Sequence, residues 1–266
     1  MNAGASIVYD NGSEHIVFEK GGPLWLTAAP DLSSVEVEMA EVQSVGQAGS
    51  SLVGQSTRAK SIAFTGCIVG DVEASRARLL RVVAPGVTAK LTYHWGGKSY
   101  WLEGAPSRTP EIGGGGVLQD FQFVVRVPYP YWRDTELEAV QISAAPGAST
   151  LSNAGNVPAA FEVRFAASGS VLAPKLTFLD SGAHITVNHT LAAGDVFTVS
   201  TRQDERKVTY TPSGAAARNG FKYLGGNSEL GLALAPGENR LQLSALNNPG
   251  NVRVTVSAPK GVYSGV

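Results

Sequence analysis

The chain has 266 residues, enough for one large domain or two ordinary domains that each bury a core. Its 21 Lys and Arg against 22 Asp and Glu give a formal charge of −1, which argues against a nucleic-acid-binding protein, because such proteins carry a basic surplus. Charged residues make up only 16%, below the roughly one quarter that is usual in soluble domains, so we expect partners to cover part of the surface.

The N-terminal residues lack the charged start and apolar run of a signal peptide. No stretch approaches the about 18 apolar residues of a membrane span. The single cysteine, Cys67, excludes a disulfide within the chain, and its apolar neighbours indicate a buried thiol. We therefore expect a soluble protein that folds in a reducing cytoplasm, without membrane insertion.

The first sixty residues predict strands and one long loop. Residues 5–9 and 15–18 flank Asn11-Gly12, a pair that supplies the positive φ angles of a tight hairpin turn. Alternation of polar and apolar residues around 35–39 indicates a second strand pair. Residues 46–57 are rich in Gly, Ser and Gln, and so predict a mobile loop.

One helix is predicted, over residues 71–84, after a strand at 61–65. Asp71 can cap its first turn, and Pro85-Gly86 ends it. A hairpin over residues 91–102 follows.

The segment after this hairpin leads to the domain boundary. A turn is predicted at 106–110 and a strand at 117–127. The four glycines 113–116 predict a second loop that is either disordered or ordered by a neighbour. Residues 135–158 are rich in Ala, Ser, Gly and Pro, which predicts a linker between domains at 1–134 and 159–266.

The second half contains strands and turns but no helical pattern. Pro236-Gly237 fits the central positions of a type II turn. The predicted strands are at 161–165, 175–179, 184–187, 196–200, 207–210, 230–234, 241–243 and 252–256. Many short strands separated by turns indicate a β-sandwich of the jelly-roll kind, so the fold class is mainly β.

Patterns that resemble catalytic or cofactor sites lack the required context. Gly96-Gly-Lys-Ser99 ends like a phosphate-binding loop, but it joins two strands and no helix follows it. His184 and His189 are five residues apart, which places them on opposite faces of a strand and excludes a shared metal. We therefore predict no catalytic, cofactor-binding or metal-binding residue, no cofactor, and no enzymatic activity.

Charge is distributed unevenly along the chain. Residues 1–50 contain seven acidic residues and one basic residue, whereas residues 51–108 contain eight basic and three acidic residues. The two segments can pair within one fold, or they can meet between neighbouring copies in a head-to-tail interface. The candidate interface residues are Glu36, Glu38, Glu41, Arg76, Arg78, Arg81 and Arg108.

Aromatic residues cluster between residues 95 and 132. The candidates are Trp95, Trp101, Tyr129, Tyr131 and Trp132, together with Tyr100. Flat rings stack on sugars, so a glycan-binding surface is one interpretation. Packing in the core or against a neighbouring subunit is the interpretation that we favour.

A series of motifs in a fixed order carries a family resemblance. In the first half these are Phe64-Thr-Gly66, Leu79-Leu80, Pro85, residues 91–102, Pro106-Ser-Arg-Thr-Pro110 and residues 123–132. In the second half they are Ala193-Gly-Asp195, Arg206-Lys-Val208, Leu234-Ala-Pro-Gly237, Asn239 and Tyr263-Ser-Gly-Val266. The series resembles the distal tail protein family of long-tailed, siphovirus-type bacteriophages over nearly the whole chain. Val127 departs from it, because the family often has a cysteine or an acid there.

The resemblance implies an N-terminal β-rich belt domain with one short helix and a C-terminal galectin-like sandwich. It implies a virion structural protein at the phage tail tip, in which belt domains form a hexameric ring, alone or as stacked rings. The ring would join the tail tube to tip or baseplate proteins and host-recognition proteins. The alternative is a carbohydrate-binding module that recognises a bacterial surface glycan through the sandwich.

Overall fold

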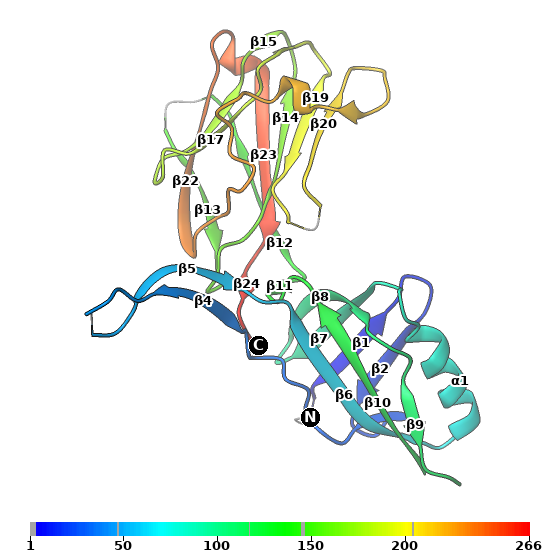
Figure 1. Cartoon of the computed structure of the whole chain (residues 1–266). Helices are drawn as coiled ribbons and strands as arrows, with labels where there is room; N and C mark the ends of the chain where they lie inside the picture. Colours follow the sequence, from blue (N-terminus) through cyan, green and yellow to red (C-terminus); the bar gives the residue numbers. More distant parts are fainter. Residues whose placement is uncertain (1–3, 47, 117, 145–146, 204) are drawn as a thin grey trace. The chain divides into compact units, whose positions relative to one another are not determined.

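The computed structural model of the chain describes residues 4–46, 48–116, 118–144, 147–203 and 205–266. Two compact units make up the chain (Figure 1): Met1–Asp134 with Tyr263–Val266, the N-terminal unit, and Thr135–Val262, the C-terminal unit. Position 47 of the predicted loop 46–57 and position 117 of the predicted strand 117–127 lie outside the described residues.

A curved antiparallel sheet forms the body of the N-terminal unit. Its strands are, in spatial order, β2 (His15–Glu19), β1 (Ser6–Asp10), β7 (Ala89–Trp95), β8 (Lys98–Pro106), β10 (Leu118–Val127), β6 (Lys60–Val69) and β3 (Leu24–Leu26). Three short strands extend it: β9 (Glu111–Gly113) on β10, β11 (Trp132–Asp134) on β8, and β24 (Val262–Tyr263) on β11.

Alternating side chains on these strands build the core of the N-terminal unit. Phe121, Phe123 and Val125 of β10 are buried, as the alternation predicts. Phe123 lies opposite Phe64 of β6, and their rings stack with centroids 4.9 Å apart.

The one α-helix among the described residues, α1 (Val72–Val82), begins and ends within two residues of the predicted bounds. Asp71 caps it by accepting a hydrogen bond from the Ala74 N–H at 3.1 Å. Leu79 and Val82 are its buried residues, so one side of the helix packs on the core.

The first hairpin turn differs from the prediction. Only Gly12 has a positive φ, of 86°, and four residues connect β1 to β2. The Asn11 carboxamide oxygen instead accepts hydrogen bonds from the N–H groups of Ser13 and Glu14, at 3.0 and 2.9 Å. An asparagine side chain that closes a turn in this way removes the need for a left-handed backbone at its own position.

The predicted mobile loop at 46–57 is wrong for its second half. β4 (Val37–Val42) and β5 (Ser51–Thr57) pair with each other as a hairpin, which we call the arm. The second predicted loop, at 113–116, begins inside β9, where Gly113 pairs with Asp120. Backbone pairing orders residues 51–57 and Gly113, and a composition of Gly, Ser and Gln does not reveal it.

Two facing sheets form the C-terminal unit and confirm the predicted β-sandwich. One is β12 (Leu137–Ile142), β23 (Val252–Pro259), β14 (Glu162–Ala167), β19 (Val196–Ser200), β20 (Lys207–Thr211) and β21 (Arg218–Asn219). The other is β13 (Ser149–Asn153), β22 (Gly237–Ser244), β16 (Lys175–Phe178) and β17 (His184–Thr186). A small pair, β15 (Val171–Leu172) and β18 (Thr190–Leu191), and two 3-10 turns, η1 (Phe221–Tyr223) and η2 (Pro249–Asn251), complete it.

Along the strands of both sheets, apolar side chains that point into the core alternate with polar side chains that point outward, as expected for a sandwich. Phe165 and Val254, partners on β14 and β23, are fully buried. Gly237 has a φ of 87°, the sign that the predicted turn requires at its second central position, and it is also the first residue of β22. Residues 230–234, predicted as a strand, form only an isolated bridge from Leu234 to Ala159.

The segment predicted as a linker, residues 135–158, contains two strands. β12 pairs with β23 from Leu137 to Ile142, and β13 pairs with β22. Both strands lie at the edge of a sheet and form backbone hydrogen bonds with only one of the strands that the structure describes. The segment therefore carries few of the apolar residues that mark a central strand. In the N-terminal unit, Tyr263 packs edge-on against Tyr100, with ring centroids 5.3 Å apart.

Candidate assembly surfaces

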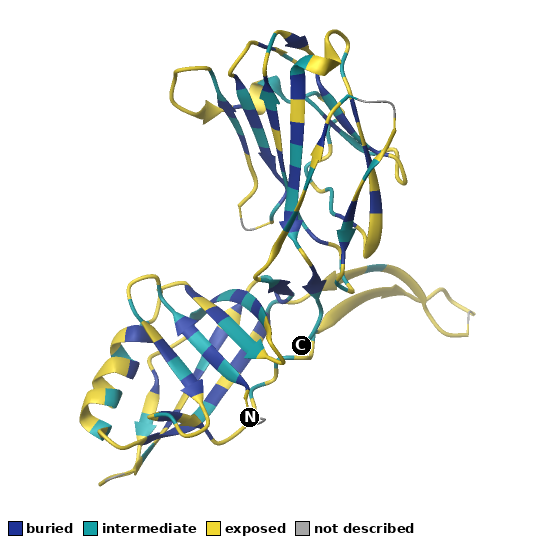
Figure 2. Ribbon diagram, turned by 180° about the vertical axis from the view of Figure 1, so that it is seen from behind, coloured by how far each residue is buried: buried dark blue, intermediate teal, exposed yellow. Residues whose placement is uncertain are grey.

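The arm exposes an apolar face to solvent. Its strands pair only with each other among the described strands, and Figure 1 shows them extending from the body of the N-terminal unit. Val37 and Met39 point to the same face because they are two residues apart on β4, and they are 43% and 60% exposed. Leu52 of β5 pairs with Glu41, two residues after Met39, so the exposed Leu52 side chain lies on this face as well. Figure 2 shows the arm as exposed along nearly its whole length.

The opposite face of the arm carries two of the predicted interface carboxylates. Glu36 and Glu38 both pair with Arg58, with N···O distances of 3.4 and 3.3 Å. The third, Glu41, accepts a hydrogen bond from the Ser50 hydroxyl. These acidic groups therefore have partners within the arm itself.

Asp31 and Lys60 form an ion pair where the chain enters and leaves the arm. The Asp31 carboxylate lies 3.7 Å from the Lys60 ammonium, and it also accepts hydrogen bonds from the Ser34 hydroxyl and the N–H groups of Ser33 and Ser34. These bonds, with a smaller contribution from Lys60, lower the pKa of Asp31 to about 2. Burial lowers the pKa of Lys60, and Asp31 opposes that shift. The pair links the segment that precedes the arm to the first residue of β6.

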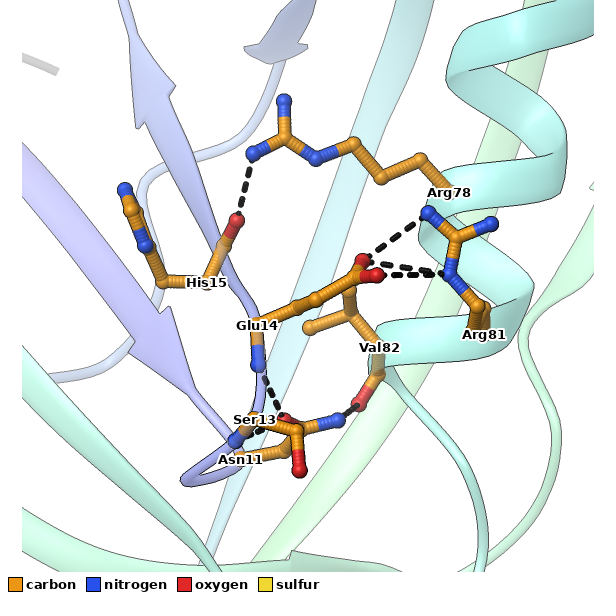
Figure 3. A network of polar contacts seen from close by, with 7 residues as sticks. All are labelled: Asn11, Ser13, Glu14, His15, Arg78, Arg81 and Val82. Carbon is orange, nitrogen blue, oxygen red and sulfur yellow. Dashed lines mark hydrogen bonds and ion pairs between the residues drawn. The ribbon is translucent and has the colours of Figure 1, made fainter.

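Arginines of α1 bind the first hairpin turn (Figure 3). Arg81 forms an ion pair with Glu14, with its Nη2 2.9 Å from a carboxylate oxygen, and Arg78 donates a hydrogen bond to the His15 carbonyl at 2.8 Å. The Arg81 guanidinium lowers the pKa of Glu14. On the same side, the Asn11 amide donates to the Val82 carbonyl at the end of the helix, at 3.1 Å.

The remaining two candidate arginines also have local partners. Arg76 donates to the Gln119 side chain at 3.3 Å, and Arg108 pairs with Glu111 at 2.8 Å. Several acidic groups of the first fifty residues thus pair with basic groups of residues 51–108 in the same chain. This was one of the two interpretations left open by the sequence. Whether the same side chains also contact another copy stays a prediction.

The aromatic candidates fall into three environments. Trp132 is fully buried, and its indole N–H donates to the Leu32 carbonyl at 2.7 Å, which matches the packing interpretation. Trp95, in the β7–β8 hairpin, is 51% exposed. The Arg133 guanidinium lies over the rings of both Trp101 and Tyr129, 4.5 and 4.6 Å from their centroids.

Two contacts in this region were missed by sequence reasoning. Arg133 joins Trp101 to Tyr129, and the Tyr131 hydroxyl is 2.7 Å from the Thr57 hydroxyl at the end of the arm. A cation directly after an aromatic cluster was an available signal for the first contact. The second joins residues 74 apart, and nothing in the sequence indicates it.

The described part of the chain holds no group of three or more His, Cys, Asp or Glu residues placed to bind a metal ion. Within the same residues, no helix combines the length and apolarity needed to span a bilayer. His189 stacks on Tyr223, with centroids 4.2 Å apart, so it has a packing role. Cys67 is buried, and burial raises the pKa of its thiol, as expected for an unreactive cysteine.

Comparison with known proteins gives both a family and a fold. The family model described as the C-terminal domain of the siphovirus-type tail component matches residues 154–257. The solved structure of the Dit protein of bacteriophage SPP1, described as a paradigm of the hub adsorption apparatus in phages that infect Gram-positive bacteria, matches with a TM-score of 0.72. It does so at 13% identity over 96% of this chain and 98% of that chain. No curated protein matches the sequence.

Two structures of the phage P2 baseplate in its activated conformation also match. The calcium form has a TM-score of 0.52 and the strontium form 0.54, each at 10% identity over 95% of this chain and 97% of that chain. At such identities the solved structures show a shared fold. The chain thus has the fold of a distal tail protein along nearly its whole length, and residues 154–257 match the model of the siphovirus-type tail component, which confirms the predicted resemblance to the distal tail protein family.

Proposed function

We propose that this protein is a structural component of a phage tail tip, in which six copies close into a ring through their N-terminal units. The ring would connect the tail tube to the tip or baseplate proteins and to the proteins that recognise the host. The observation that carries the proposal is the arm, a two-stranded hairpin whose apolar face meets solvent in the single chain.

A two-stranded hairpin needs a further surface to pack against. An isolated pair of strands is at best marginally stable in water, and contiguous exposed apolar surface marks a site of association. An arm makes a head-to-tail contact when each copy gives its arm to one neighbour and receives the arm of another. Such contacts close into rings when the rotation per copy divides a full turn.

A lysine on either face of the arm tests this use of the hairpin. Met39→Lys places a charge on the apolar face and is expected to weaken ring formation at least about tenfold, because the charge must be desolvated in the contact. Ser56→Lys adds the same charge to the opposite face, since Ser56 pairs with Glu38, and is expected to leave assembly unchanged. Light scattering and negative-stain imaging measure both variants.

Equal assembly of the two lysine variants would contradict a contact through the apolar face. A wild-type protein that stays monomeric at every concentration would contradict a ring that closes without other tail proteins. Rings of six, or stacked pairs of such rings, are the expected result for the wild type.

A charged contact between copies is a second element of the proposal. Acidic groups of residues 1–50 would meet basic groups of residues 51–108 on the next copy, so Arg76→Glu with Arg81→Glu is expected to abolish assembly. Because Arg81 already pairs with Glu14, the control adds Glu14→Arg to restore that internal ion pair. Assembly lost in both proteins supports the contact; assembly that the control restores, or that neither change affects, contradicts it.

A further inference from the structure

Two arginines face the same way from neighbouring strands of the six-stranded sheet. Arg164 of β14 lies opposite Thr255 of β23, and Arg253 of β23 lies opposite Ala166 of β14. The arginines are therefore diagonal neighbours, with backbones about 7–8 Å apart, within reach of one small ligand. Their sequence neighbours Phe165 and Val254 are fully buried, so both guanidinium groups lie on the outer face of the sandwich.

A cavity of about 450 Å³ lies on this face and is lined by both arginines. This size suits a small ligand. The other hydrogen-bonding side chains that line it are Gln141, Ser143, Ser168 and Thr255, and its lining residues include no carboxylate. The cavity thus combines two positively charged side chains with uncharged donors and acceptors.

Two other arginines of the sandwich have an acidic partner, whereas these two have none in the part of the chain that the structure describes. Arg240 pairs with Asp180 at 2.7 Å, and Arg202 lies 3.7 Å from Glu205. Among the described residues, neither Arg164 nor Arg253 forms an ion pair within 4.0 Å. Two like charges side by side repel each other, and an anion held between them would remove that repulsion.

We propose that this cavity binds an anionic saccharide, a sugar unit that carries a carboxylate or a phosphate. The arginine pair accounts for the anion, because the guanidinium fork binds either group with two parallel hydrogen bonds. Gln141, Ser143 and Thr255 account for the sugar, because amides and hydroxyls match a ligand whose hydroxyls both donate and accept. No aromatic ring lines the cavity, so recognition rests on charge and hydrogen bonds and not on stacking.

Calorimetry on the full chain tests the proposal with three probes. Trigalacturonate supplies carboxylates, its methyl ester supplies the same sugars without charge, and glucose 6-phosphate supplies a phosphate. We expect trigalacturonate, glucose 6-phosphate or both to bind, and the methyl ester to bind at least about tenfold more weakly than trigalacturonate if the carboxylate is the ligand.

Substitutions identify the site. Arg164→Gln and Arg253→Gln are each expected to weaken binding of the anionic probe at least about tenfold, because each removes one charged hydrogen-bonding fork. Arg240→Gln, which removes an equal charge from the four-stranded sheet, is the control and is expected to change nothing. Circular dichroism checks that every variant is folded.

Each outcome decides the proposal. Binding of trigalacturonate, glucose 6-phosphate or both, with loss in both cavity variants, supports it, and binding of only one identifies the anion. Failure of both anionic probes, or binding that neither cavity variant weakens, overturns it. The ring is measured separately on the same samples by light scattering, so failure of the assembly proposal leaves this result unaffected.

Discussion

Trp132→Ala is expected to lower the free energy of unfolding of the N-terminal unit by about 3 to 5 kcal/mol. The side chain is fully buried, and its indole packs near Tyr93, with ring centroids 6.2 Å apart. The substitution leaves a cavity and also removes the donor that the Leu32 carbonyl uses. All four tryptophans of the chain lie in this unit, so the fluorescence of the remaining three reports its unfolding in urea.

Two further substitutions separate the loss of core packing from the loss of the hydrogen bond. Trp95→Ala removes an indole of the same size from a half-exposed position and is expected to change the free energy of unfolding by no more than about 0.5 kcal/mol. Trp132→Phe keeps most of the packing but loses the hydrogen bond to Leu32, so it should give an intermediate loss. If Trp132→Ala costs no more than Trp95→Ala, the indole of Trp132 is not a core element.

Gly66→Ala is expected to destabilise the same unit by about 3 kcal/mol or more. A Cβ atom at Gly66 would lie 2.3 Å from the Trp25 carbonyl oxygen and 2.6 Å from the Cζ of Phe121. The first of these is backbone in β3, which pairs with β6, so relief of the clash requires the two strands to separate. Urea unfolding followed by tryptophan fluorescence measures the loss.

The arm supplies a matched control for this glycine. At Gly54 in β5 the same added atom would lie 3.9 Å from the Cβ of Ala40, which is ordinary contact. Gly54→Ala is expected to be neutral or to stabilise slightly, since alanine restricts the unfolded chain. Equal losses for the two variants would show that glycine serves backbone freedom at both positions and not close packing at Gly66.

The sequence predicts best where one local rule determines the structure. Alternation placed Phe121 and Phe123 on one face, and the Asp71 cap with Pro85-Gly86 bounded the helix to within two residues. The same rules fail for β5, because its pairing with β4 is made by the backbone. They also fail for β12 and β13, which are edge strands with little apolar content.

The candidate surfaces were harder to predict, because long-range contacts decide the role of each charge. Arg81 was a candidate for a contact between copies, and in the structure it pairs with Glu14, 67 residues earlier in the chain. Arg164 and Arg253 are separated by 89 positions and were not candidates at all. Only the register of β14 with β23 places them together.

The division of the chain at Tyr263 has a consequence for synthesis. Residues 263–266 belong to the N-terminal unit, where Tyr263 packs on Tyr100 and Gly265 lies against the backbone of Ser33. A ribosome must therefore translate the whole sandwich before the N-terminal unit receives its last residues. Domains generally fold in order as they emerge, but here the first unit to emerge is the last to be completed.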